Sequence, residues 1–282
     1  MASYHPAMQD APAPACAAPL DPEAGWTPLV TLRPPGAGRD EEVAVEVPIA
    51  LTVNGVSQAV MLATPADLDD FALGFALAEG WIAAPHELVD LETEARADGI
   101  ELALTITAAR EQGLKLRRRQ LAGRTGCGLC GLESLADFAS LQPHPVQAPA
   151  LSPDALARSM AALRDAQPLN ARCGGLHGAA WCAPDGSLHF AREDVGRHNA
   201  LDKLIGARAR AAVRQNRSPG AEPGFVAMSS RASHELVHKA AMAGIGLLAC
   251  VSAPSSLAIQ TAQGLGLQLW AFVREGRATR YA

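Results

Sequence analysis

"GFVAMSSRASHELVHKAAMAGIGLLACVSAPSSLAIQTAQGLGLQLWAFV" (residues 224–273) contains three short apolar runs, and two segments with apolar residues at helical spacing separate them. Strands that alternate with helices need crossover connections, which favour a largely parallel sheet with helices on both faces. This stretch therefore predicts an α/β fold, and specifically a three-layer α/β/α sandwich.

The same alternation of strands and helices is present in the residues that precede this stretch. A serine cap at Ser152, a proline at the next position and helical apolar spacing predict a helix over residues 152–167. Two strands follow, "LHGAAWCA" and "SLHFARE", with the turn "PDG" between them, and a helix is predicted from Asp194. We assign residues 151–282 to one C-terminal α/β domain.

The N-terminal half predicts a smaller α+β domain over residues 26–112. Apolar residues alternate on both sides of Asn54 and Gly55, which is typical of a β-hairpin. Thr64 as cap and Pro65 in the first turn predict a helix directly afterwards, and residues 99–108 alternate again as a strand.

Two further segments carry no regular pattern. Residues 1–25 are rich in Ala and Pro, so we predict a disordered tail in which Cys16 is incidental. Residues 113–150 hold a basic segment, a glycine-rich loop with two cysteines and a Pro-rich linker, and we expect the loop to be mobile.

The composition of the chain argues against several classes of protein. The chain has 282 residues, 49% of them apolar, a formal net charge of −5 and six cysteines at irregular spacing. The acidic balance gives no general reason to expect nucleic-acid binding, and no apolar run approaches the roughly 20 residues of a membrane span. We expect a cytoplasmic protein that binds neither nucleic acids nor membranes and has no secreted-type disulfide framework.

The loop "AGRTGCGLCGL" (residues 122–132) places Cys127 and Cys130 two residues apart, and three interpretations are open. The pair could be half of a zinc site with Cys173, His177 and Cys182, although these spacings match no zinc ribbon. It could be a redox dithiol, although such a pair usually opens a helix. It could also hold a nucleophilic thiolate, because neighbouring cations lower the pKa of a thiol. The basic residues before the pair are Lys115, Arg117, Arg118, Arg119 and Arg124.

Polar residues of the C-terminal half form two further candidates. The first is Asp194, His198 and Asp202, spaced at i, i+4 and i+8, with Arg197 and Lys203 beside them. They could form the polar wall of a site or a capped helix with internal ion pairs. The second is Ser229, Ser230 and Arg231, which precede a predicted helix. They could bind an anion there or merely cap the helix.

"HELVH" (His234–His238) has the form of the zinc-protease motif, in which both histidines bind zinc and Glu235 acts as a base. No third ligand follows, since the next acidic residue is the distant Glu275. We interpret His234 and His238 as residues of a helix surface and predict no metal site, with a zinc hydrolase as the alternative.

Several stretches, in this order, resemble the FdhD/NarQ family of sulfurtransferases needed for formate dehydrogenase activity. They are "EVPIALTVNG", "DLDDFALGFALAEGWI", "RRRQLAGRTGCGLCG", "HGAAW", "EDVGRHNALDKLIG", "SSRASHELVHKAAMAGI", "VSAPSSLAIQTA" and "FVREGRATRY". The resemblance runs from about Val43 to the C-terminus, and the two histidines of "HELVH" are not part of it.

The resemblance implies a sulfur carrier. A cysteine desulfurase would load sulfur onto Cys127 as a persulfide, and Cys130 would relay or resolve it. The sulfur would then pass to the molybdenum cofactor, a bis(molybdopterin guanine dinucleotide), before its insertion into formate dehydrogenase. The resemblance also implies a cytidine-deaminase-like fold for the C-terminal domain, and a homodimer. The alternative function is a cofactor-binding chaperone whose cysteine pair senses redox state or holds zinc.

The family's cofactor-contacting stretch falls on Phe272, Val273, Arg274, Glu275, Gly276 and Arg277. "FVREGR" follows the last apolar strand, and ligands of open α/β sheets bind at the carboxyl ends of strands. Arg274 and Arg277 could bind nucleotide phosphates bidentately. A surface turn with solvated charges is the simpler interpretation of these residues alone.

Overall fold

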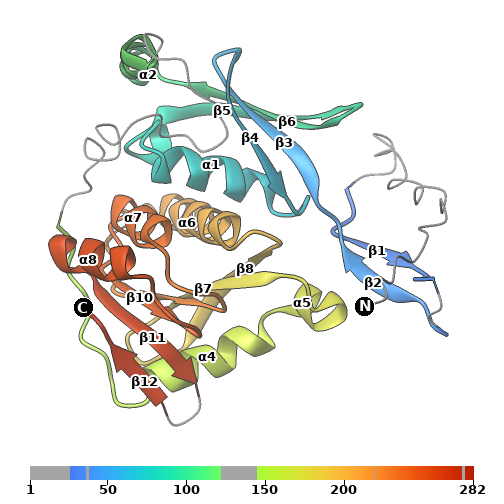
Figure 1. The fold of residues 1–282 in the computed structure, drawn as a ribbon. Helices are drawn as coiled ribbons and strands as arrows, with labels where there is room; N and C mark the ends of the chain where they lie inside the picture. The colour runs from blue at the N-terminus through green and yellow to red at the C-terminus, as the bar shows by residue number, and fades with distance from the viewer. Residues whose placement is uncertain (1–25, 36–37, 122–144, 219, 275–276) are drawn as a thin grey trace, which may run out of the picture.

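The computed structural model describes residues 26–35, 38–121, 145–218, 220–274 and 277–282. Two sheets and the helices that cover them form the body of the molecule, and a small two-stranded ribbon projects from one side (Figure 1). The ribbon pairs β1 (Leu29–Leu32) with β2 (Glu41–Ala44). The predicted tail, residues 1–25, lies outside the described residues.

The N-terminal sheet has four strands in the order β4-β3-β6-β5. Its strands are β3 (Val47–Val53), β4 (Val56–Ala63), β5 (Leu88–Arg96) and β6 (Gly99–Ile106). The predicted hairpin is confirmed: Asn54 and Gly55 join β3 to β4 with φ angles of 46° and 77°. Helix α1 (Leu68–Ala78) covers one face of this sheet, and a short 3₁₀ turn, η1 (Pro85–Glu87), precedes β5.

Helix α1 begins four residues after the predicted cap. Asp67 takes a left-handed conformation with φ of 53°, so the helix starts at Leu68. Thr64 is fully buried instead, and its hydroxyl accepts a hydrogen bond from the backbone N–H of Val195 at 3.2 Å. The cap prediction for Thr64 was wrong because this residue ties the hairpin to the C-terminal half of the chain.

Helix α2 (Ala108–Leu121) contains the start of the basic segment. It runs through residue 112, where we predicted the first domain to end, so this stretch is helical at least as far as Leu121. The cysteine loop that follows lies outside the described residues.

The C-terminal sheet has six strands in the order β12-β11-β10-β9-β7-β8. They are β7 (His177–Cys182), β8 (Leu188–Asp194), β9 (Phe225–Met228), β10 (Leu247–Cys250), β11 (Gln268–Arg274) and β12 (Arg277–Arg280). Only β9, β10 and β11 run parallel, and the other three neighbouring pairs are antiparallel. The predicted "largely parallel" sheet is therefore mixed: the sequential pairs β7–β8 and β11–β12 are antiparallel, and β9 also runs antiparallel to its neighbour β7.

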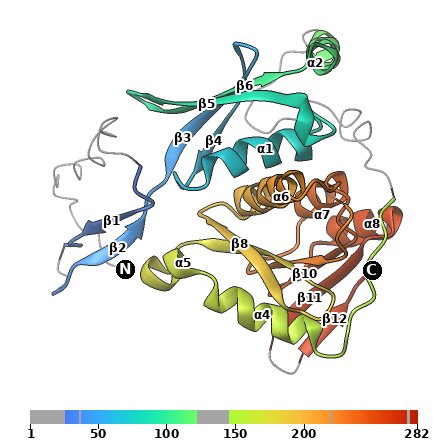
Figure 2. The same ribbon diagram turned by 180° about the vertical axis from the view of Figure 1, so that it is seen from behind.

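Helices cover both faces of this sheet, which confirms the three layers (Figures 1 and 2). One face carries α6 (Arg197–Arg214), α7 (His234–Met242) and α8 (Ser256–Leu265). The other carries α4 (Ala155–Asp165), which leads into the short α5 (Pro168–Cys173). Helix α4 begins three residues after the predicted Ser152 cap, because Asp154 has a φ of 64°.

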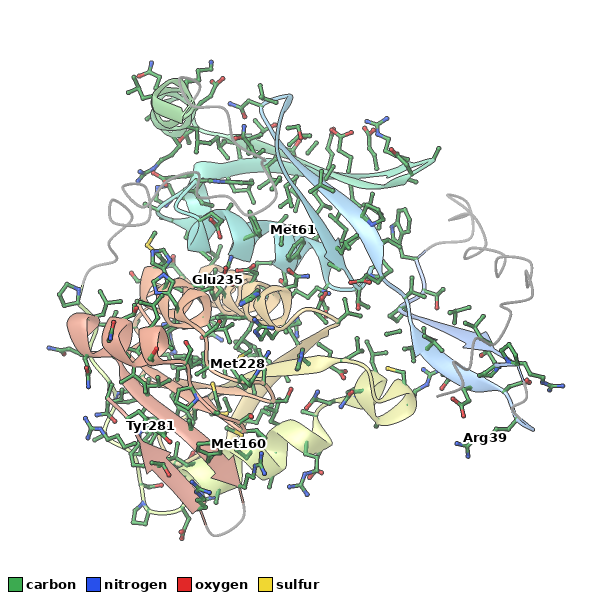
Figure 3. The ribbon with its side chains drawn as sticks, viewed as in Figure 1. Arg39, Met61, Met160, Met228, Glu235 and Tyr281 are labelled. Carbon is green, nitrogen blue, oxygen red and sulfur yellow. The ribbon has the colours of Figure 1, made fainter. Side chains whose placement is uncertain are left out.

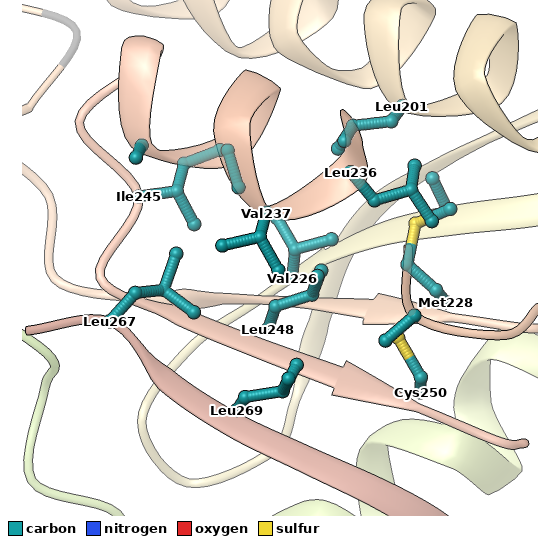
Figure 4. Packing of buried hydrophobic residues seen from close by; sticks show 14 of the residues in the cluster. Leu201, Val226, Met228, Leu236, Val237, Ile245, Leu248, Cys250, Leu267 and Leu269 are labelled. Carbon is teal, nitrogen blue, oxygen red and sulfur yellow. The ribbon is translucent and has the colours of Figure 1, made fainter. Parts of the chain in front are cut away.

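Apolar side chains fill the space between each sheet and the helices that cover it. Between the sheet and α6–α8, fully buried residues such as Leu236, Leu248 and Leu269 interdigitate (Figure 4). A second cluster lies between the sheet and α4, and a third between the N-terminal sheet and α1. Truncating one such leucine to alanine costs about 2–5 kcal/mol, so these clusters hold the layers in place.

Helices α1 and α6 cross at very short range and join the two sheets. Gly74 of α1 faces the backbone of Asp202, and Gly206 of α6 faces the backbone of Asp70. A Cβ at either glycine would lie less than 2 Å from a carbonyl oxygen of the opposite helix. No helix in the described part of the chain is both long and apolar enough to cross a membrane.

Candidate functional site

A pocket of about 560 Å³ opens at the carboxyl ends of the three parallel strands, on the face covered by α4. Ser229, Val251 and Arg274 come from the ends of β9, β10 and β11, and Arg164 and Gln167 come from the end of α4 and the residues after it. Small-molecule pockets in proteins typically measure roughly 300–1,000 Å³, so the space suits a small ligand. Met160 of α4, labelled in Figure 3, forms part of the apolar wall.

A second pocket of about 690 Å³ also borders Arg274. Residues 151–157, Trp270 and Arg277 line it, and it shares Ala157, Val273 and Arg274 with the first pocket. The two pockets together form the groove discussed below: both include Arg274, and Arg164 lines the first and Arg277 the second. Such a groove suits a ligand with flat rings and negative charges.

The predicted cofactor-contacting stretch lies at this groove. Val273 is buried in its floor, and the exposed Arg274 donates from Nε to the carbonyl oxygen of Val251 at 3.2 Å. Phe272 has a φ of 52°, a strained conformation for a non-glycine residue, and the guanidinium of Arg277 lies 4.6 Å from the centre of its ring. The predicted residues Glu275 and Gly276 lie outside the described residues.

The structure does not form the predicted helix face with Asp194. Asp194 ends β8, and α6 begins three residues later. The carboxylate of Asp194 is fully buried, 2.6 Å from Nζ of Lys203, and accepts hydrogen bonds from the backbone N–H groups of Thr64 and Gly196. A buried carboxylate needs such partners, so Asp194 holds the two halves of the chain together rather than facing a ligand.

Asp202 is equally buried, but it points to a different neighbour. Both carboxylate oxygens of Asp202 lie 3.0 Å from Nζ of Lys239 on α7, and the same ammonium group lies 2.8 Å from Glu79. Burial raises the pKa of Asp202 to about 7, although Lys239 opposes this shift. The interpretation of these aspartates as partners in internal ion pairs is the one that agrees with the structure.

The "HELVH" residues have partners other than a metal. Nε2 of His198 lies 2.8 Å from the carboxylate of Glu235, which is labelled in Figure 3, and 3.2 Å from the hydroxyl of Ser233. Nδ1 of His234 lies 2.8 Å from the hydroxyl of Thr261. The part of the chain that the structure describes contains no group of three or more His, Cys, Asp or Glu residues that could hold a metal ion.

Ser229 and Ser230 do not cap α7. Ser233 is the cap, accepting from the N–H of Leu236, whereas the hydroxyl of Ser229 accepts from the N–H of Gly178 and joins β9 to β7. The prediction that Ser229, Ser230 and Arg231 lie at the helix N-terminus was wrong, because α7 starts only after Ser233. The hydroxyl of Ser230 donates to the backbone carbonyl of Arg231.

His177 lies at the start of β7, where it is half-buried. Burial lowers its pKa, and the nearby positive charges of Arg197, His198 and Arg231 lower it further. Cys182, at the other end of the same strand, is fully buried in the core, which raises the pKa of its thiol to about 12. A zinc site built from Cys173, His177 and Cys182 is therefore not formed, because His177 and Cys182 lie at opposite ends of β7.

The cysteine pair, Cys127 and Cys130, lies outside the described residues, so its assignment as a reactive pair stays a prediction. Sequence reasoning missed Arg164, Gln167 and Trp270 as pocket residues. No local signal identifies them, because helical spacing predicts a helix over residues 152–167 and an apolar run predicts the strand around Trp270, but neither pattern shows which side chains border a cavity.

The sequence is similar to those of known proteins over most of its length. The sequence profile of the FdhD/NarQ family matches residues 44–282. The chain is 52% identical over 232 residues to the sulfur carrier protein FdhD of Variovorax paradoxus, covering 82% of this chain and 81% of the relative. It is 48% identical to the sulfur carrier protein FdhD of Chromobacterium violaceum, covering 92% of this chain and 96% of that protein.

The fold also has a counterpart among solved structures. A proposed formate dehydrogenase accessory protein from Desulfotalea psychrophila superposes with a TM-score of 0.67, over 90% of this chain and 94% of that one. At 23% identity, this likeness concerns the fold alone.

Proposed function

The chain belongs to the FdhD/NarQ family, and on this premise we propose that it is a sulfurtransferase that carries sulfur as a persulfide for formate dehydrogenase. Its partners are a cysteine desulfurase, which supplies the sulfur, and the catalytic subunit of formate dehydrogenase, which receives the finished cofactor. We place this activity in the cytoplasm and in a homodimer.

Cys127 is the proposed sulfur carrier. Its thiolate attacks the outer sulfur of the persulfide on the desulfurase. The sulfur–sulfur bond of that persulfide breaks, and the desulfurase cysteine leaves as a thiolate. Cys182 and Cys250 are poor candidates, because burial raises the pKa of both thiols to about 12 and keeps them protonated. Cys130 would relay the sulfur or resolve the persulfide.

The sulfur acceptor is the molybdenum cofactor, a bis(molybdopterin guanine dinucleotide), bound as substrate. The groove around Arg274 suits its guanine nucleotide portion, since apolar residues such as Met160 and Val273 form the wall and floor. Arg164, Arg274 and Arg277 supply guanidinium groups for phosphates, which bind such groups bidentately. When bound, the cofactor supplies the metal that takes up the sulfur.

One observation carries this proposal: a single family match, over residues 44–282, includes both the Cys127–Cys130 pair and the groove around Arg274. The test is mass spectrometry of the full chain after incubation with a cysteine desulfurase and cysteine. We expect a mass increase of one sulfur atom on a peptide that contains Cys127, and its loss on treatment with a thiol reductant.

Matched variants make the test specific. Cys127→Ala should abolish the added sulfur, whereas Cys173→Ala, which removes a partly exposed thiol outside the pair, should leave it unchanged. Sulfur found on Cys173, or a Cys127→Ala protein that still supports formate dehydrogenase in cells, would contradict the proposal. The second result would favour a cofactor-binding chaperone.

A further inference from the structure

The second pocket of the groove contains a carboxylate that the fold does not use. Asp154 lines this pocket, is exposed and directly precedes α4. Aspartates at this position commonly cap a helix, but the side chain of Asp154 accepts no hydrogen bond from the first turn. It also forms no ion pair with any residue that the structure describes. The acceptor sites of this carboxylate are therefore available to a ligand.

Two cations line the same pocket, and neither pairs with Asp154. Arg274 donates from Nε to the carbonyl oxygen of Val251, and the guanidinium of Arg277 lies 4.6 Å from the centre of the Phe272 ring. Positive and negative groups thus line one pocket of about 690 Å³ without forming an ion pair with each other. Such a pocket is complementary to a ligand that carries negative charge on one part and hydrogen-bond donors on another.

An aromatic ring also lines this pocket. Trp270 of β11 packs against the apolar cluster between the sheet and α4, and it is only partly buried. Its indole Nε1 donates to the side-chain oxygen of Gln268 at 3.5 Å, so the surface that remains for a ligand is apolar. Nucleic-acid bases stack on aromatic side chains whatever their identity, because every base has a flat face. Trp270 therefore suits a flat ring, and the choice among rings requires a polar group of the pocket.

We infer that this pocket binds the guanine base of a nucleotide: Trp270 stacks on the base, and the carboxylate of Asp154 accepts hydrogen bonds from its N1–H and its 2-amino group. This inference rests on the proposed function, which places a guanine nucleotide in the groove. Guanine carries these two donors side by side, and one carboxylate can accept both. Adenine has an unprotonated nitrogen at N1, which a carboxylate repels, so Asp154 would also exclude adenine nucleotides.

The test compares GDP with xanthosine diphosphate, whose base has a carbonyl oxygen where guanine has the 2-amino group. Binding to the full chain is measured by titration calorimetry. Asp154→Asn replaces one carboxylate oxygen by an amide NH₂, which can donate to that carbonyl while the remaining oxygen accepts from N1–H. We expect the variant to bind GDP roughly tenfold more weakly than wild type does, and xanthosine diphosphate roughly tenfold more tightly than wild type does.

A role of Asp154 as a mere surface charge predicts the opposite sign for GDP. Removing a carboxylate from the pocket of Arg274 and Arg277 would then strengthen the binding of both diphosphates alike. Asp165→Asn is the matched control, because Asp165 is an exposed carboxylate at the other end of α4 and lines neither pocket. We expect it to leave the affinity for both nucleotides unchanged.

Trp270 is tested by two variants. Trp270→Leu should weaken GDP binding roughly tenfold, which is the order of magnitude of one stacking contact between a base and an aromatic side chain. Trp270→Phe keeps an aromatic ring and should retain most of the affinity. If Trp270→Leu does not fold, Asp154→Asn decides, because Asp154 is exposed and its replacement leaves the core intact.

Unchanged or tighter GDP binding by Asp154→Asn would overturn the inference, and so would a variant that gains no affinity for xanthosine diphosphate. A folded Trp270→Leu protein that binds GDP as wild type does would also overturn it. A wild-type protein that binds no GDP would overturn it together with the proposed cofactor groove. Persulfide formation on Cys127 is measured separately, so the sulfur-carrier function can stand or fall independently of Asp154.

Discussion

Lys239→Met should remove a large part of the stability of the fold. Lys239 is buried, its ammonium lies 3.0 Å from both carboxylate oxygens of Asp202, and it contacts the ring of Phe75 at 4.7 Å. The variant keeps most of the side-chain volume but leaves the fully buried Asp202 without its cation. Breaking a buried pair in this way costs about 3–5 kcal/mol. The lost contact with Glu79, whose side chain is 37% exposed, adds less than about 1 kcal/mol.

The assay is equilibrium unfolding in urea, followed by circular dichroism. A loss of about 3–5 kcal/mol is substantial, because domains are commonly stable by only about 5–15 kcal/mol. The double variant Lys239→Met with Asp202→Leu should recover most of the loss, since apolar residues often replace a buried ion pair at little cost. Lys115→Met is the control, because Lys115 pairs with Glu111 on the exposed surface of α2 and should contribute less than about 1 kcal/mol.

The pH dependence of Lys239→Met follows from Asp202. Burial already raises the pKa of Asp202 above its ordinary 3.8 to about 7, and removing Lys239 takes away the charge that opposes this rise. A raised pKa in the folded state means that protonation stabilises the fold, an effect complete below about pH 4 and lost as the pH rises through the folded-state pKa. The variant should therefore be closest to wild type in mild acid and weakest above pH 7. A loss below about 1 kcal/mol at pH 8, or a double variant no more stable than the single one, would refute this reasoning.

Three other outcomes are expected. Arg274→Ala should weaken GDP binding at least tenfold by calorimetry, because hydrogen bonds to charged groups contribute about 1.5–3 kcal/mol, and unchanged affinity would remove Arg274 from the site. Gly74→Ala should prevent stable folding, since the new Cβ would lie 1.7 Å from the backbone oxygen of Asp202, and a normal melting temperature would contradict the close helix crossing. In acid titrations of stability, Glu235→Gln should flatten the curve below about pH 4.5. His198 lowers the pKa of Glu235, so this pair stabilises the fold above pH 4.5 and is lost as the pH falls through the lowered value.

Helix and strand positions were predictable wherever local periodicity decided them. The hairpin around Asn54 and Gly55 follows from residue types that tolerate positive φ angles. Helix starts were less predictable, because Asp67 and Asp154 adopt left-handed conformations that only their surroundings select. Strand β5 contains no fully buried residue, and its apolar residues do not alternate regularly enough to identify it from the sequence.

The residues of the candidate site also differ in how far the sequence could predict them. Arg274 was assigned to the site by the family resemblance, and its place at the end of β11 agrees with the tendency of ligands to bind at the carboxyl ends of strands, although its role stays a prediction. Asp194 was misassigned to a helix, since a run of polar residues does not show where β8 ends and α6 begins. Gln167 could not be predicted at all, because its burial against Gly178 depends on a contact between α4 and β7.

The sequence by itself determined the three-layer α/β architecture and the family, because periodicity and motif order are properties of neighbouring residues. Only the tertiary structure decided which polar groups pair with one another across the fold. Asp194 and Asp202 have partners in Lys203 and Lys239, whereas the amide nitrogen of Gln167 has none in the described chain. The physical reason is that hydrogen bonding and burial are satisfied between segments far apart in the chain, which no local pattern records.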